Sequence, residues 1–279
     1  MSRTISLGIS TCPNDTFAFH GLLTRAVDWR GLDFQVELLD IEQLNTRMAR
    51  DAFDVCKVSF AGALPLARDV VVLPSGSALG FGVGPLLLAA RPDTRPTDAS
   101  QLTLCPGEQT TAMLLFSMFH DGTTRIEQAV FSEIMPRLAG GTADFGVCIH
   151  EGRFTWQASG LALVEDLGSR WETETGCPLP LGGIVAARRL GPEVIAAVQR
   201  VIRDSLECAL ADPATALPTM RRHAQEFDDT VLMQHVELYV NDWTLNLGDT
   251  GRRALAELSA RAAATGLAPA TRLEIFGDR

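Results

Sequence analysis

Lys57 is the only lysine of this 279-residue chain, and the other 23 basic side chains are arginines. An ammonium is a compact point charge on a flexible stem, whereas a guanidinium is a rigid planar fork. A chain that uses arginine everywhere else therefore indicates that position 57 requires an ammonium. The alternative, which the sequence leaves open, is a solvated surface lysine retained by chance. Val58 and Ser59 follow directly and complete this candidate segment.

His150 is the best placed candidate for proton transfer. It follows the apolar run 145–149 and precedes Glu151, Gly152 and Arg153. Imidazole exchanges protons near neutral pH, and a neighbouring carboxylate can fix its tautomer. A histidine that only forms a hydrogen bond at a strand end remains the alternative. The other histidines lie on helix-like segments without clustered polar neighbours, and we expect structural roles for them: His20, His120, His223 and His235.

Thr110 and Thr111 stand at the start of an apolar helix predicted over 112–119. Hydroxyl groups and unpaired amides at a helix start can hold a carboxylate or a phosphate. Simple capping of the helix by a threonine is the alternative. Asn14 and Asp15 follow a strand predicted over 4–10, where one of them can cap the next helix.

The composition limits the partners of the chain. Its net charge of −10 and pI near 5.0 give no general attraction to nucleic acid or to an anionic membrane. No apolar run reaches the roughly 18 residues of a membrane helix. The first residues lead directly into a strand without a leader-like apolar stretch, so we expect a soluble cytoplasmic protein that binds a small molecule. A homodimer stays open.

The six cysteines stand singly, without the close Cys or His pairs of a structural metal site, so we expect no metal. Cys56, Cys105 and Cys148 lie within apolar runs and are expected to be packing residues. The glycine-rich stretch 75–84 lacks the Gly-Lys-Ser/Thr ending of a nucleotide loop, and we expect it to permit close backbone approach between domains.

Strand-like and helix-like segments alternate through most of the chain, which is typical of an α/β fold. Two similar apolar runs, 84–91 and 182–189, read as crossings between two lobes. We therefore predict a large lobe from residues 1–90 and 186–279 with a helical C-terminal part, and a small lobe from residues 91–185. Ligands of open α/β sheets bind beyond the carboxyl ends of strands. The candidate residues named above follow such ends and are predicted to meet across a cleft.

The order of these segments resembles the 1,4-dihydroxy-6-naphthoate synthases of the futalosine route to menaquinone. The resemblance covers nearly the whole chain, and its most specific elements are Cys12-Pro13-Asn14-Asp15-Thr16-Phe17 and the run 150–155. Further elements are Lys57-Val58-Ser59, the runs 80–86 and 176–182, Thr110-Thr111-Ala112 and Tyr239-Val240-Asn241.

This resemblance implies a two-lobed periplasmic-binding-protein-like fold of type II with a central cleft. It also implies a lyase that converts cyclic dehypoxanthinyl futalosine to 1,4-dihydroxy-6-naphthoate without metal or organic cofactor. By position His150 corresponds to the proton acceptor, and residues 57–59 and 110–111 correspond to substrate-binding segments. Gly152 departs from the family, because relatives often carry serine there.

Several residues can hold the carboxylate of such a substrate. Lys57, Arg153 and the helix start at Thr110 are the available donors in an acidic chain. Two other functions remain open. One is the chorismate dehydratase of the same pathway, and the other is a non-catalytic protein that binds small carboxylates.

Overall fold

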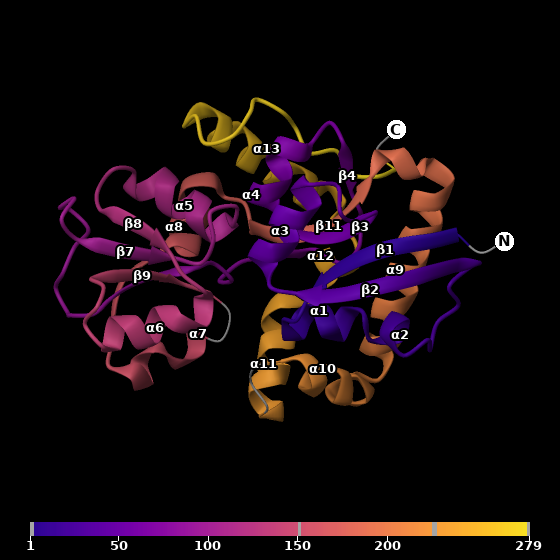
Figure 1. The fold of residues 1–279 in the computed structure, drawn as a ribbon, viewed down its shortest axis with the longest axis horizontal. Helices are drawn as coiled ribbons and strands as arrows, with labels where there is room; N and C mark the ends of the chain where they lie inside the picture. Colours follow the sequence, from indigo (N-terminus) through magenta and orange to yellow (C-terminus); the bar gives the residue numbers. More distant parts are fainter. Residues whose placement is uncertain (1–2, 150–151, 225–227, 278–279) are drawn as a thin grey trace.

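The computed structural model describes residues 3–149, 152–224 and 228–277. These residues form two β-sheets side by side, each covered by helices (Figure 1). The predicted mixed α/β architecture is therefore confirmed. None of the described helices is long and apolar enough to cross a membrane.

The first sheet has the strand order β2-β1-β3-β11-β4, and β5 pairs with β11 beside β4. Its strands are β1 (Arg3–Ser10), β2 (Leu32–Leu39), β3 (Val55–Ser59), β4 (Val70–Val72), β5 (Ala78–Gly80) and β11 (Leu179–Ala187). Strand β1 runs parallel to β2 and β3, whereas β11 is antiparallel to β3, β4 and β5. Because helices cover both faces of this sheet, its central strands are almost continuously apolar.

The second sheet has the order β10-β6-β9-β7-β8. Its strands are β6 (Leu86–Ala89), β7 (Leu102–Cys105), β8 (Arg125–Gln128), β9 (Phe145–Cys148) and β10 (Ala162–Asp166). Strand β7 is parallel to β8 and β9, and β6 is antiparallel to β9 and β10. The parallel strands β7 and β9 end at Cys105 and Cys148, so the segments that follow them begin at the same end of the strands.

The chain passes between the two sheets twice, once before β6 and once before β11. Strand β6 already pairs within the second sheet, and the whole of β11 lies in the first. A short apolar run between glycine and arginine has the same sequence pattern whichever sheet it belongs to. Only the pairing of its strand shows which sheet that is. We therefore propose the division into lobes near residues 81–85 and 176–178.

Glycines allow close backbone contact at these crossings. A Cβ atom on Gly84 would lie 2.2 Å from the Cα atom of Gly168. The segment that enters the second sheet therefore packs directly on the first turn of α8 (Leu167–Thr175). This agrees with the role expected for the glycines of the stretch 75–84.

Helices enclose the sheets on both faces (Figure 1). One side of the first sheet packs on α1 (Pro13–Ala18), α2 (His20–Leu23) and α9 (Pro192–Ala211) in a core that contains Phe17, Leu22 and Val201. The other side shares one core with α3 (Ile41–Ala49), α4 (Phe60–Ala63), α5 (Thr111–His120) and α13 (Gly248–Ala264). Because α5 belongs to the second-sheet half, this core joins the two halves of the molecule.

The remaining helices complete the cover of each sheet. Helix α6 (Phe131–Ala139) lies on the second sheet, and α7 (Gly152–Thr155) follows β9. The predicted helical segment 192–266 is confirmed, and besides α9 and α13 it contains α10 (Leu217–His223), α11 (Asp229–Tyr239) and α12 (Asp242–Leu245). Helices α10 and α11 pack on α1 and therefore on the first-sheet half.

Candidate active site

A pocket lies where the two sheets meet and is lined by residues from both halves. The first-sheet half contributes polar side chains from the end of β1 and the segment that follows it, from β3 itself and from α11. The second-sheet half contributes the start of α5 and Ile149, which follows β9. The polar lining residues are Ser10, Cys12, Asn14, Asp15, Lys57, Ser59, Thr110, Thr111, His235 and Tyr239. The predicted cleft between the candidate segments is therefore present.

Lys57 forms a buried ion pair in this pocket. Its Nζ atom lies 2.5 Å from Oδ1 of Asp15, and it also donates to the carbonyl oxygen of Gly76 at 3.4 Å. Asp15 comes from the first turn of α1, so the pair joins this helix to β3. Lys57 is thus no solvated surface lysine. Because Asp15 neutralises it, the pair gives the pocket little net positive charge.

Asn14 extends this pair to a histidine. Its amide nitrogen donates to Oδ1 of Asp15 at 3.0 Å, and its oxygen lies 3.1 Å from Nε2 of His235. His235 also packs against Tyr239, with 4.5 Å between the ring centroids. Four polar side chains from three elements thus form one connected group.

The side chains of residues 57–59 lie on opposite faces of β3. Side chains alternate along a strand, and Lys57 and Ser59 both line the pocket. The side chain of Val58 lies instead in the shared core with Leu44 and Phe60. Asn45 fixes Ser59, because it accepts a hydrogen bond from the Ser59 amide at 2.8 Å and donates to its hydroxyl at 3.2 Å.

The start of α5 presents two amide groups to the pocket. Thr110 is the N-cap, and its hydroxyl accepts from the amide of Met113 and donates to Gly107. The hydroxyl of Thr111 donates to the carbonyl oxygen of Leu181 at 2.7 Å. Within the described part of the chain, the amides of Thr111 and Ala112 have no acceptor. The capping alternative is therefore correct for Thr110, while two donors stay available to an anion.

Contacts with the first-sheet half hold this helix start in place. The carboxylate of Glu42 accepts from the amide of Gln109 at 3.2 Å, and Asn45 donates to the carbonyl oxygen of Gln109 at 3.2 Å. Burial raises the pKa of Glu42, although hydrogen bonds from Gln109 and Asn45 oppose the shift. The two halves are therefore joined directly beside the pocket.

Arg153 lies outside the pocket lining that the described residues form. Its guanidinium donates to the carbonyl oxygen of Gly84 at 2.5 Å and to the carboxylate of Asp166 at 2.7 Å. Arg153 therefore ties α7 to the crossing before β6 and to the end of β10. A role of Arg153 as a donor to the ligand stays a prediction.

His150 lies outside the described residues, so its placement stays a prediction. Ile149, the residue before it in sequence, lines the pocket. Gly152, the departure from the family pattern, is buried near the Sδ atom of Met135.

The sequence-based interpretation did not include Ser10, Cys12, His235 or Tyr239 among the site residues. His235 was expected to be structural, yet it lines the pocket together with Tyr239. A usable signal was present, because Tyr239 is the only tyrosine of the chain and lies four residues after His235. Residues four apart on a helix share one face.

The three cysteines expected to pack in the core are all buried. Burial raises the pKa of Cys56, and raises those of Cys105 and Cys148 to about 12. These thiols are therefore protonated and unreactive at neutral pH. No cluster of three metal-binding side chains occurs among the described residues.

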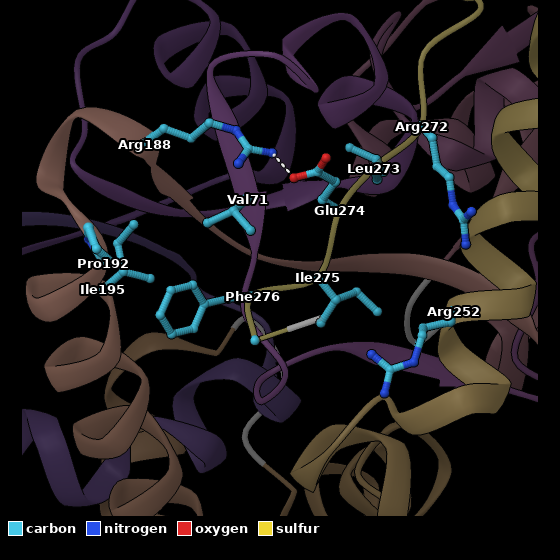
Figure 2. Close-up of a pocket in the computed structure, with 11 residues that line it drawn as sticks. Val71, Arg188, Pro192, Ile195, Arg252, Arg272, Leu273, Glu274, Ile275 and Phe276 are labelled. Carbon is cyan, nitrogen blue, oxygen red and sulfur yellow. Dashed lines mark hydrogen bonds and ion pairs between the residues drawn. The ribbon is translucent and has the colours of Figure 1, made fainter. Parts of the chain in front are cut away.

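A larger cavity of about 1050 Å³ lies elsewhere, beside β4, the start of α9 and the C-terminal segment. Figure 2 shows its three arginines, of which Arg188 points toward Glu274 and pairs with it. Arg252 bonds to Asp249. None of the predicted site residues lines this cavity. The chemistry-bearing side chains of the described chain gather in the smaller pocket instead.

Comparisons with known proteins show the family of the chain. A family model described as menaquinone biosynthesis matches residues 5–264. The chain belongs to the menaquinone-biosynthesis family. Two curated members named 1,4-dihydroxy-6-naphthoate synthase are each 41% identical to it. The relative from Thermus thermophilus aligns over 98% of this chain and 99% of its own length, and that from Streptomyces coelicolor over 96% and 95%.

Solved structures place this family member in its fold class. A protein from Archaeoglobus fulgidus has a TM-score of 0.89 at 28% identity and covers 95% of this chain and 98% of its own. A ligand-binding component of an ABC-type import system from Staphylococcus aureus has a TM-score of 0.69 at 11% identity, with coverages of 96% and 94%. A Candida albicans protein with the generic periplasmic binding protein fold has a TM-score of 0.64 at 9% identity, with coverages of 96% and 92%. The predicted periplasmic-binding-protein-like fold is confirmed.

Proposed function

We propose that this chain is a 1,4-dihydroxy-6-naphthoate synthase, a carbon–carbon lyase that acts on cyclic dehypoxanthinyl futalosine in the cytoplasm. The observation that carries the proposal is the pocket itself. Asn14, Asp15, Lys57, Thr110 and Thr111 come from separate segments of the chain and line one cavity. Relatives that bear this name align over nearly the whole chain at 41% identity.

The substrate carboxylate is proposed to bind at the start of α5. Thr111 and Ala112 both line the pocket, and their amides lie in the first turn of a ten-residue helix. A helix start favours negative charge through its unpaired amides and its dipole. The alternative donors are occupied, because Lys57 pairs with Asp15 and Arg153 pairs with Asp166.

His150 is proposed to act as the general base, because it follows Ile149 of the pocket lining and its residue type suits proton removal. His150 would accept a proton from the cyclised substrate, and the electron pair left behind would form a double bond as a carbon–carbon bond breaks. A three-carbon fragment would leave with the electrons of the broken bond and take up a proton, and aromatisation of the remaining product would drive the step. A base alone contributes about 10²–10⁴-fold, so positioning and water exclusion in a closed cleft must supply the rest.

The size of the pocket supports binding through lobe movement. Its volume of about 100 Å³ is small, whereas small-molecule pockets are typically about 300–1,000 Å³. The two halves must therefore separate to admit a bicyclic substrate, and the contacts of Glu42 and Asn45 with Gln109 are those that would open.

Product analysis tests this function against the two alternatives. Purified protein is incubated separately with cyclic dehypoxanthinyl futalosine and with chorismate, and products are identified by mass spectrometry. Formation of 1,4-dihydroxy-6-naphthoate from the first substrate alone supports the proposal. Dehydration of chorismate would instead identify the dehydratase, and binding without turnover of either would identify a carboxylate-binding protein.

A further inference from the structure

The carboxylate of Asp15 uses only one of its two oxygens in contacts with the described residues. Lys57 and Asn14 both donate to Oδ1, at 2.5 and 3.0 Å. Within the described part of the chain, no group donates to Oδ2. Only 2% of Asp15 is exposed to solvent, and polar atoms of such buried side chains nearly always have a hydrogen-bond partner. Oδ2 is therefore an acceptor that the fold leaves unused.

Oδ2 of Asp15 is open to the pocket. Two side-chain atoms of the described residues are enclosed by protein and lack a partner, and these are Nε1 of Trp29 and Oγ of Ser77. Oδ2 of Asp15 is not one of them, so part of its surface is accessible. Because Asp15 lines the pocket between the two halves, this accessible surface faces the pocket.

The two sides of the pocket prefer opposite ligand groups. An ionised carboxylate only accepts hydrogen bonds, so a ligand group beside Oδ2 of Asp15 must be a donor. A ligand carboxylate would be repelled there. The amides of Thr111 and Ala112 at the start of α5 only donate, and they favour an anion. The pocket can therefore distinguish the two ends of a ligand that carries a carboxylate at one end only.

We propose that Asp15 contacts the substrate directly and that its Oδ2 accepts a hydrogen bond from a ligand hydroxyl group. The inference rests on the proposed function, since it takes its ligand from there. In 1,4-dihydroxy-6-naphthoate the hydroxyl groups are on one ring and the carboxylate is on the other. The hydroxyl ring then faces Asp15 and the carboxylate faces Thr111 and Ala112. Attraction at one end and repulsion at the other fix the orientation of the ligand.

Lys57 has a role in this arrangement that requires no contact with the substrate. Together with Asn14 it occupies Oδ1 of Asp15, which leaves Oδ2 for the ligand. Its positive charge also offsets that of Asp15, which alone would repel an anionic substrate from the pocket. An ammonium suits this position, because its rotatable donors can serve Asp15 and the carbonyl oxygen of Gly76 together.

Three ligands separate the hydroxyl contact from the carboxylate contact. Anaerobic calorimetry compares 1,4-dihydroxy-6-naphthoate with 2-naphthoate, which has the same ring system and carboxylate without hydroxyl groups. The third ligand, 1-tetralone-6-carboxylate, has a carbonyl group, which only accepts, in place of one hydroxyl group. A hydrogen bond to a charged group changes affinity by about 10- to 150-fold. We expect the wild type to prefer the dihydroxy ligand over 2-naphthoate by a factor in this range.

Asp15→Asn should lower this preference by about five- to tenfold. Lys57 and Asn14 still require an oxygen, so the new amide nitrogen takes the place of Oδ2 and donates instead of accepting. For the same reason 1-tetralone-6-carboxylate should bind about five- to tenfold more tightly to this variant than to wild type. A loss of stability cannot produce such a gain. Asp54→Asn is the matched control, because Asp54 is also paired with a cation, Arg189, but lies outside the pocket lining. It should keep all three wild-type affinities.

The double variant Lys57→Met with Asp15→Leu removes both charges together and supplies a second measurement. It should bind the dihydroxy ligand and 2-naphthoate within about twofold of each other, because the acceptor is lost. Both affinities come from the same sample, so an unfolded fraction does not change their ratio. A wild-type preference in either Asp15 variant would overturn the inference while leaving the proposed function intact. Failure of both naphthoates to bind the wild type would overturn the inference together with the ligand class it depends on.

Discussion

Lys57 donates a 2.5 Å hydrogen bond to Asp15, and the two side chains are only 6% and 3% exposed. Removing one partner of such a pair leaves an uncompensated buried charge, which costs far more than the loss of a surface ion pair. The ion pair therefore stabilises the contact between the segment after β1 and the middle of β3.

Lys57→Met should lower the free energy of unfolding by about 3–5 kcal/mol, because Asp15 is left buried without its counter-charge. The double variant Lys57→Met with Asp15→Leu should recover much of this loss. Arg203→Met is the control, since Arg203 and Glu207 are about half exposed, and it should cost less than about 1 kcal/mol. Denaturant titration measures all four proteins. Similar small losses for both single variants would show that the buried pair contributes little.

Thr111→Pro should weaken the binding of 2-naphthoate, because it removes the Thr111 amide. Proline is tolerated at the first position of a helix, and Thr110 already has the extended backbone that precedes proline. A hydrogen bond to a charged group contributes about 1.5–3 kcal/mol, which calorimetry would detect as roughly a 10- to 150-fold loss of affinity.

Thr111→Val is the matched control for this experiment, because it removes the hydroxyl and keeps the amide. Its hydroxyl already donates to Leu181, so the valine variant should bind the ligand far better than the proline variant. Equal affinities of wild type and Thr111→Pro would place the carboxylate elsewhere.

Arg153→Met and Asp166→Asn should reduce activity to a similar extent, because each breaks the same link between α7 and the end of β10. The double variant should be no worse than Arg153→Met alone, since the shared contact is already lost. Steady-state kinetics measure the coupling. A large increase in KM for the arginine variant, without one for the aspartate variant, would show that Arg153 binds the substrate.

Much of this site could be predicted because its residues follow strand ends. The candidate segments were located from apolar runs and the polar residues behind them, and the structure brings Asn14, Asp15, Lys57, Ser59, Thr110 and Thr111 into one pocket. Lys57 and Ser59 were expected after the third strand, but they lie within β3. A strand end shows in local sequence, because the apolar run stops there.

Partners from distant segments were not visible in the same way. The acceptor of Lys57 lies 42 residues away, and the partner of Asn14 lies 221 residues away. Arg153 looked like a free cation in sequence, but the fold places Asp166 beside it. The role of a polar side chain depends on the residue it contacts, and a single sequence does not show which distant residues come into contact. The sheet membership of β6 was missed for the same reason.

Glu42 should make the wild type less stable as the pH rises above about 4.5. Its pKa is raised in the folded state by burial, so the native protein binds more protons than the unfolded chain in this range. Its favourable contribution is complete below the unfolded pKa and is lost as the pH rises through the folded pKa.

Glu42→Gln should remove this dependence, so its stability relative to wild type should increase between pH 4.5 and 7. Asp54→Asn is the control, because Arg189 and Ser6 hold the pKa of Asp54 below its usual value despite desolvation, so its stability relative to wild type should stay nearly constant over this range and change only at lower pH. Thermal or denaturant unfolding across this pH range measures the difference in the free energy of unfolding between each variant and wild type. A stability difference that stays constant with pH would show that Glu42 titrates normally.

The most direct test of the whole account is the turnover of cyclic dehypoxanthinyl futalosine by His150→Gln. We predict a loss of about 10²–10⁴-fold in kcat, with 2-naphthoate affinity within a few-fold of wild type, because a general base acts mainly on the transition state. His120→Gln, which alters a histidine bonded to Glu165, should keep wild-type kcat. Wild-type kcat in His150→Gln would contradict the proposed mechanism.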